Sequence, residues 1–216
     1  MSALVFDDTA CSLGEGPLWH PQTQGLFWFD INTARLYRKI GDDLSKWQFD
    51  EHVSAAGWID DRYLMVASET QLMEFDTHTG ESAFLCPLDS ANPVTRSNDG
   101  RADPWGGFWI GTMGKQAEPK AGAIYRYYKG EMRRLFADIT ISNSICFSPD
   151  GLWAYFTDTN TQQIMRQRLA DPDGWPTGTP SVHIDLQADK LNPDGSVVDA
   201  QGALWNAQWG AGRVAR

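Results

Sequence analysis

The 216-residue sequence has no long hydrophobic run, no cluster of basic residues and few cysteines. A membrane-spanning helix needs about 18 or more predominantly apolar residues in a row, and the sequence contains no such stretch. It has 18 Lys and Arg against 28 Asp and Glu, for a net charge of −10. Nucleic acids and anionic membranes attract clustered positive charge, so neither is an expected partner.

The cysteines and the N-terminus lack the patterns of a secreted or zinc-thiolate protein. Cys11, Cys86 and Cys146 are widely separated and form no CxxC pair, so we expect buried thiols that act as small hydrophobic residues. Residues 1–8 have neither the basic region nor the apolar segment of a signal peptide. These features predict a cytoplasmic location.

The sequence also lacks helical periodicity, because no segment of 12 or more residues repeats its apolar positions convincingly every three to four residues. It contains ten Trp, twenty Gly and eleven Pro. Large aromatic rings suit half-buried strands, and frequent Gly and Pro indicate many short turns. The composition therefore favours an all-β protein.

A turn followed by a short aromatic or aliphatic strand recurs five times. If the strand centres are taken as Trp28, Met65, Trp109, Tyr155 and Trp205, their spacings are 37, 44, 46 and 50 residues. One four-stranded blade of a β-propeller takes about 40–50 residues. A β-sandwich also has short strands and many turns, but it does not predict so regular a repeat.

We therefore predict a single β-propeller domain over residues 1–216. Alternating segments at 34–40, 71–77, 122–130 and 163–169 follow the first four repeats and are expected to be the next strand of each blade. The fifth repeat reaches only its second such strand at Arg216. Because a propeller avoids open edges by closing its ring, we expect the chain to be C-terminally incomplete.

Four turn-rich segments carry polar side chains that the turns themselves do not need. They are LGEGP (13–17) with Glu15, TRSNDG (95–100) with Arg96 and Asn98, ISNS (141–144) with Asn143, and NPDG (192–195) with Asp194. Each could be an ordinary turn or a solvated carboxylate. Loops at one end of a propeller converge, however, so these residues could also meet.

One Glu, one Asn and one Asp from different repeats form an oxygen-rich set that contains neither Cys nor His. Such a set favours hard cations such as calcium, magnesium or manganese, with zinc also possible. The four histidines have no metal-ligand spacing and are expected on the surface. GxSxG, GxxxxGK[ST] and GxGxxG are all absent.

The motifs LGEGPLW, RxNDG…DPxGxFWxGTM, SN…FSPDG…YFTDT and PDG…VDxxGxLW occur in the order and spacing of one family. With them the chain resembles the gluconolactonase and senescence-marker-protein (regucalcin) family over essentially its whole length. The resemblance implies a six-bladed propeller whose final blade is absent or incomplete here. It also implies one divalent metal ion, held by Glu15, Asn143 and Asp194.

The resemblance further implies that Arg96, Asn98 and Glu118 bind the substrate. Two residues depart from the family pattern: Ser144 stands where Gly is usual, and Gly107 stands where Arg is common. Neither departure removes a ligand.

The expected activity is metal-dependent hydrolysis of small lactones, most simply sugar lactones, with Asp194 as the general base toward water. Two alternatives stay open. The same propeller could hydrolyse another ester or an organophosphate, or it could be a non-catalytic binding module.

Overall fold

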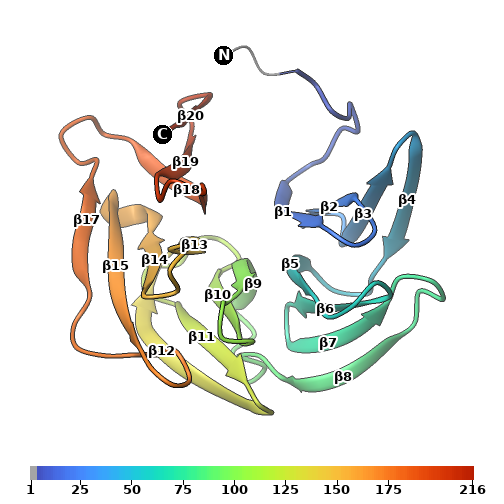
Figure 1. Cartoon of the computed structure of the whole chain (residues 1–216), viewed down its shortest axis with the longest axis horizontal. Helices are drawn as coiled ribbons and strands as arrows, with labels where there is room; N and C mark the ends of the chain where they lie inside the picture. The colour runs from blue at the N-terminus through green and yellow to red at the C-terminus, as the bar shows by residue number, and fades with distance from the viewer. Residues whose placement is uncertain (1–3) are drawn as a thin grey trace.

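The computed structural model describes residues 4–216, which form five antiparallel sheets that follow one another around a common axis (Figure 1). In each sheet the first strand lies nearest the axis and later strands lie progressively further out. The described residues contain no α-helix, only the 3-10 turn η1 (Thr159–Thr161). The predicted all-β propeller is confirmed, with five blades in this part of the chain.

The first two blades each have four strands in sequential order. They are β1 (Gly14–His20), β2 (Gly25–Asp30), β3 (Arg35–Ile40) and β4 (Asp43–Gln48), then β5 (Val53–Trp58), β6 (Tyr63–Ser68), β7 (Gln71–Asp76) and β8 (Ser82–Pro87). The third blade is built in the same way. Its strands are β9 (Thr95–Ala102), β10 (Phe108–Gly114), β11 (Gly122–Tyr128) and β12 (Glu131–Ile139).

The fourth blade has an additional short strand, and the fifth has three strands. The fourth contains β13 (Ser142–Phe147), β14 (Trp153–Asp158), β15 (Gln163–Ala170) and β17 (Ser181–Asp185), with β16 (Trp175–Pro176) paired to the end of β15. The fifth contains β18 (Asn192–Val198), β19 (Leu204–Trp209) and β20 (Arg213–Ala215). The five repeated segments of the sequence are the second strands of the blades, and the segments that follow the first four repeats are the third strands.

Four apolar clusters lie between neighbouring blades and hold the ring together. Strand alternation explains how one strand serves two of them. On β10, Phe108 and Ile110 pack toward the second blade, whereas Trp109 between them packs toward the fourth. All three are almost fully buried, and burying each such side chain contributes about 1.5–3 kcal/mol.

The cysteine and histidine expectations are only partly met. Cys86 and Cys146 are buried free thiols, but Cys11 is partly accessible. His20 is buried rather than on the surface, because it ends β1 facing the second blade. There its ring contacts that of Trp58, and its Nε2 lies 2.8 Å from the carbonyl oxygen of Asp60.

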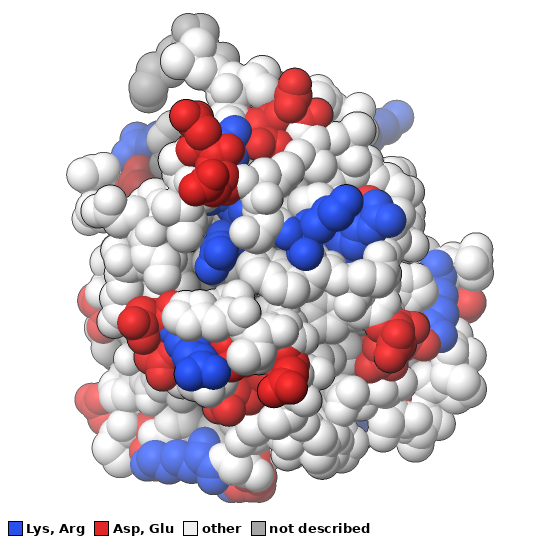
Figure 2. All heavy atoms as spheres, turned by 90° about the vertical axis from the view of Figure 1, so that its right-hand side faces the viewer, with Lys and Arg blue, Asp and Glu red and all other residues white. Residues whose placement is uncertain are grey.

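The outer surface carries charges of both signs. On the face shown in Figure 2, Lys and Arg lie in small separate groups among Asp and Glu. None of residues 4–216 forms a helix with the length and hydropathy needed to cross a membrane.

Candidate functional site

The candidate site is a cavity of about 250 Å³ near the axis, lined by residues from four different blades. Five of the six residues predicted from the sequence line it: Glu15, Arg96, Asn98, Asn143 and Asp194. They lie on the innermost strands β1, β9, β13 and β18. The convergence expected from a propeller thus brings together side chains that are up to 179 positions apart in the sequence, from 15 to 194.

The innermost strands share a local irregularity at the level of the cavity. Regular pairing is interrupted after Glu15 on β1, after Asn143 on β13 and after Pro193 on β18, and the β9–β10 pairing shifts next to Asn98. A bulge inserts an extra residue and re-aims the side chains beside it. The bulges therefore help to aim Glu15, Asn143 and Asp194 toward the axis.

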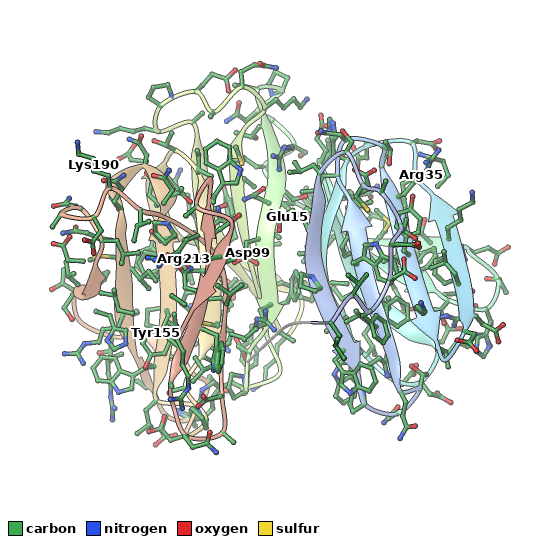
Figure 3. All side chains as sticks on the ribbon, turned by 90° about the horizontal axis from the view of Figure 1, so that it is seen from above. Glu15, Arg35, Asp99, Tyr155, Lys190 and Arg213 are labelled. Atoms are coloured by element: carbon green, nitrogen blue, oxygen red, sulfur yellow. The ribbon has the colours of Figure 1, made fainter. Side chains whose placement is uncertain are left out.

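On β1, the bulge depends on Gly16, whose φ is +57°. Its Cα lies so close to the second blade that an added Cβ would be 2.2 Å from the carbonyl oxygen of Ser54. Only glycine has both the conformational freedom and the small size that this position requires. The neighbouring Glu15 consequently lies near the axis, in the central region where Asp99 is also found (Figure 3).

On β9, Arg96 and Asn98 point to the same side of the strand, as their two-residue spacing predicts. Arg96 Nη1 donates hydrogen bonds to the carbonyl oxygen of Ser97 and to Asn98 Oδ1, both at 2.8 Å. Asn98 Nδ2 donates to the carbonyl oxygen of Ser142 at 2.8 Å and makes a longer contact of 3.3 Å to Asn143 Oδ1. Arg96, Asn98 and Asn143 are all buried.

The loop around Asp194 is fixed through its backbone. Ser144 has a φ of +59°, and its hydroxyl donates to the carbonyl oxygen of Asp194 at 2.6 Å. Asn206 Nδ2 donates to the same carbonyl at 3.1 Å. Ser144, which stands where the family usually has Gly, thus keeps the left-handed backbone and adds a tie between the fourth and fifth blades.

The carboxyl groups near the axis are difficult to ionise. Burial, followed by the charges of Asp194 and Asp99, raises the pKa of Glu15 to about 8. Burial is also the main cause that raises the pKa of Asp99 to about 6, and it raises the pKa of Asp194. A bound cation would stabilise the ionised forms of these groups.

The donors that line the cavity suit a hard divalent cation. Glu15 and Asp194 supply carboxylate oxygens and Asn143 supplies an amide oxygen, whereas no His or Cys of the described residues lines this cavity. Across residues 4–216, no three His, Cys, Asp or Glu side chains are grouped closely enough to hold a metal ion by themselves. The Asn143 amide is available there as a third protein ligand beside the two carboxylates.

Glu118 is placed differently from the other predicted residues. It lies in the loop after β10, where its carboxylate accepts a hydrogen bond from the backbone N–H of Gln116 at 3.0 Å. It is not among the residues that line the cavity, although Ala117 beside it is.

The structure adds residues that the sequence reasoning missed. Thr159 and Trp209 line the cavity. Asp99 lines a second cavity, which it shares with Glu15 and Asp194 and which extends to Trp28 and Trp205. Asp99 was not predicted because Asn98-Asp99-Gly100 has the sequence of an ordinary turn. Trp209 follows the fifth repeat, and no neighbouring motif indicates a function for it.

The fold and the site together define a class: a β-propeller whose innermost strands surround a small cavity lined by carboxylate and amide groups. The chain belongs to the SMP-30/gluconolactonase/LRE-like family, whose model matches residues 13–216. The resemblance seen in the sequence motifs is therefore confirmed.

Individual relatives agree with this family. The chain is 40% identical to a putative sugar lactone lactonase of Rhizobium meliloti and 36% identical to an L-arabinolactonase of Azospirillum brasilense; each match covers 99% of this chain and 73% of the relative. Among solved structures, a calcium-binding protein, regucalcin, from Agrobacterium tumefaciens superposes with a TM-score of 0.93 at 44% identity. That match covers 96% of this chain and 71% of the other.

Proposed function

We propose that this protein hydrolyses sugar lactones at the cavity formed by β1, β9, β13 and β18. The main support is that one cavity of about 250 Å³ is lined by Glu15, Arg96, Asn98, Asn143 and Asp194. The similarity to a putative sugar lactone lactonase and to an L-arabinolactonase supports this substrate class.

One divalent cation (calcium, zinc, magnesium or manganese) would be held by Glu15, Asn143 and Asp194. The Agrobacterium regucalcin is a calcium-binding protein, which supports a metal ion at this site. When bound, the ion would act as a Lewis acid toward the ring carbonyl.

Asp194 is proposed as the general base. Its carboxylate takes a proton from water while the water oxygen forms a bond to the carbonyl carbon. The carbonyl then re-forms as the ring C–O bond breaks, and the ring oxygen takes that proton from Asp194.

Arg96 and Asn98 are proposed to bind the sugar hydroxyls, since a buried polar site selects substrates that satisfy its hydrogen bonds. Within residues 4–216, Arg96 donates hydrogen bonds only through Nη1, so its other N–H groups are available to a ligand. Glu118 is proposed as a further contact, which requires its side chain to leave the Gln116 amide.

Substrate profiling after chelation and metal addition tests the proposal. Chelated protein should lose turnover of sugar lactones and regain it with one of the four cations. Faster turnover of a non-sugar lactone or an organophosphate would favour the alternative hydrolase. No turnover of any ester, with or without metal, would favour a binding module.

Site variants assign the roles. Asp194→Asn should reduce kcat by about 10²–10⁴-fold, the range expected for loss of a general base. Arg96→Ala should mainly raise KM. The exposed Asp189 lies outside the cavity, so Asp189→Asn serves as the matched control and should behave like the wild type. Wild-type turnover by Asp194→Asn would contradict the mechanism.

Two further expectations stay predictions. The family resemblance implies closure by six blades, and the residues described here form five. A cytoplasmic location likewise rests on the sequence alone.

A further inference from the structure

A continuous chain of hydrogen bonds crosses the candidate site from the third blade to the fifth. It starts at Arg96, passes through Asn98, Asn143 and Thr159, and ends at the backbone of Pro193. All four side chains are buried, with exposures of 8%, 6%, 4% and 6%. At this depth each polar atom needs a partner of the right kind, because an unpaired buried donor or acceptor costs about 1–3 kcal/mol.

The direction of the chain follows from its two ends. The carbonyl oxygen of Pro193 can only accept, so the hydroxyl of Thr159, 2.7 Å away, must donate its single proton there. Thr159 Oγ1 can then only accept from Asn143, whose side chain lies 2.9 Å away. The atom of Asn143 that faces Thr159 is consequently the amide nitrogen, Nδ2.

The other end imposes the same direction. Arg96 can only donate, so the atom of Asn98 that it contacts at 2.8 Å is Oδ1. Asn98 Nδ2 then donates to the carbonyl oxygen of Ser142 at 2.8 Å and faces Asn143 Oδ1 at 3.3 Å. Both ends therefore agree on the orientation of the Asn143 amide.

We propose that Thr159 is a positioning residue that holds the Asn143 amide with its oxygen, not its nitrogen, available to a cation in the cavity. This inference rests on the proposed function, in which Asn143 is a metal ligand. Because Thr159 also binds the carbonyl of Pro193, the residue before Asp194, it ties together the strands that carry two of the three ligands. Mutation of a residue that hydrogen-bonds to a metal ligand commonly lowers the metal affinity by about 10–100-fold.

Direct binding of Mn²⁺ by purified, chelator-treated protein tests the proposal without relying on turnover. Thr159→Val keeps the shape of the side chain but removes the hydroxyl, and Thr159→Ser keeps the hydroxyl. A matched control is Thr157→Val, because Thr157 is also buried and its hydroxyl donates to the carbonyl oxygen of Gln163, which is not part of this series of hydrogen bonds.

We expect the Kd for Mn²⁺ to rise about 10–100-fold in Thr159→Val. Thr159→Ser and Thr157→Val should each stay within about threefold of the wild type. Recovery of affinity in the serine variant distinguishes orientation of the amide from a general packing role. An unchanged Kd in Thr159→Val, or equal losses in Thr159→Val and Thr159→Ser, would overturn the proposal.

A second readout separates this inference from the proposed function. The side-chain amide signals of Asn143 in ¹H–¹⁵N NMR spectra can be assigned by their loss in Asn143→Asp. In metal-free protein these protons should exchange with solvent at least tenfold faster in Thr159→Val than in the wild type or Thr159→Ser. If the wild type binds no divalent cation, the proposed metal site fails. The exchange rates then decide the positioning role alone, and equal rates in all three proteins would refute it.

Discussion

Gly16→Ala should destabilise the protein strongly, because two separate costs meet at this residue. Gly16 has a φ of +57°, and a left-handed backbone costs about 1–2 kcal/mol for any residue with a Cβ. The added Cβ would also lie 2.2 Å from the carbonyl oxygen of Ser54 and 2.9 Å from the ring of Phe29. Overpacking of this kind adds about 1–3 kcal/mol, which gives a total loss of about 2–5 kcal/mol.

Gly41→Ala is the matched control for this change. Gly41 lies in the turn between β3 and β4 with the same φ of +57°, but nothing lies within 4 Å of its added Cβ. The free energy of unfolding of Gly41→Ala should therefore fall only by the cost of the left-handed backbone, about 1–2 kcal/mol. The difference between the two variants therefore isolates the close approach of β1 to the second blade.

Urea unfolding followed by tryptophan fluorescence measures both free energies. The loss in Gly16→Ala should exceed that in Gly41→Ala by about 1–3 kcal/mol. Affinity for Mn²⁺ should fall only in Gly16→Ala, because the residue that moves is next to Glu15. Equal losses of stability in the two variants would refute the packing argument at β1.

Two other expectations concern charge. Because the pKa of Glu15 rises from 4.5 to about 8 on folding, the folded protein retains a proton that the unfolded chain releases. The stability linked to this group is complete below pH 4.5 and is lost as the pH rises through about 8. Thermal unfolding in a chelator should show this decline, and Glu15→Gln should reduce it; an unchanged pH profile in that variant would contradict the assignment. Arg126 and Asp103 form a fully buried ion pair at 2.6 Å, whereas Arg133 and Glu131 form an exposed one. Arg126→Ala should therefore cost about 3–5 kcal/mol and Arg133→Ala less than about 1 kcal/mol in urea unfolding, and similar losses would be inconsistent with this difference in burial.

The blade repeat could be predicted from the amino-acid sequence alone. Strand periodicity and turn residues are local properties, so the spacing of Trp28, Met65, Trp109, Tyr155 and Trp205 identified the second strand of every blade. The polar residues beside turns could likewise be identified as candidates, because the turns themselves do not require those side chains. The motifs also carried enough information for the family to be recognised.

The directions in which those side chains point depend on how the blades pack, and they could not be predicted from the sequence. The bulges that turn Glu15 and Asn143 toward the axis depend on contacts between blades, such as that of Gly16 with Ser54. The orientation of Glu118 also could not be read from its motif, because it depends on the fold of its own loop.

The proposed role of Thr159 likewise could not be predicted from the sequence. Its hydroxyl has one proton, and the acceptor of that proton is a carbonyl 34 residues further along the chain. Local sequence specifies strands because their periodicity repeats over neighbouring residues. The direction of a buried hydrogen bond is decided only when distant strands pack together and exclude water from between them.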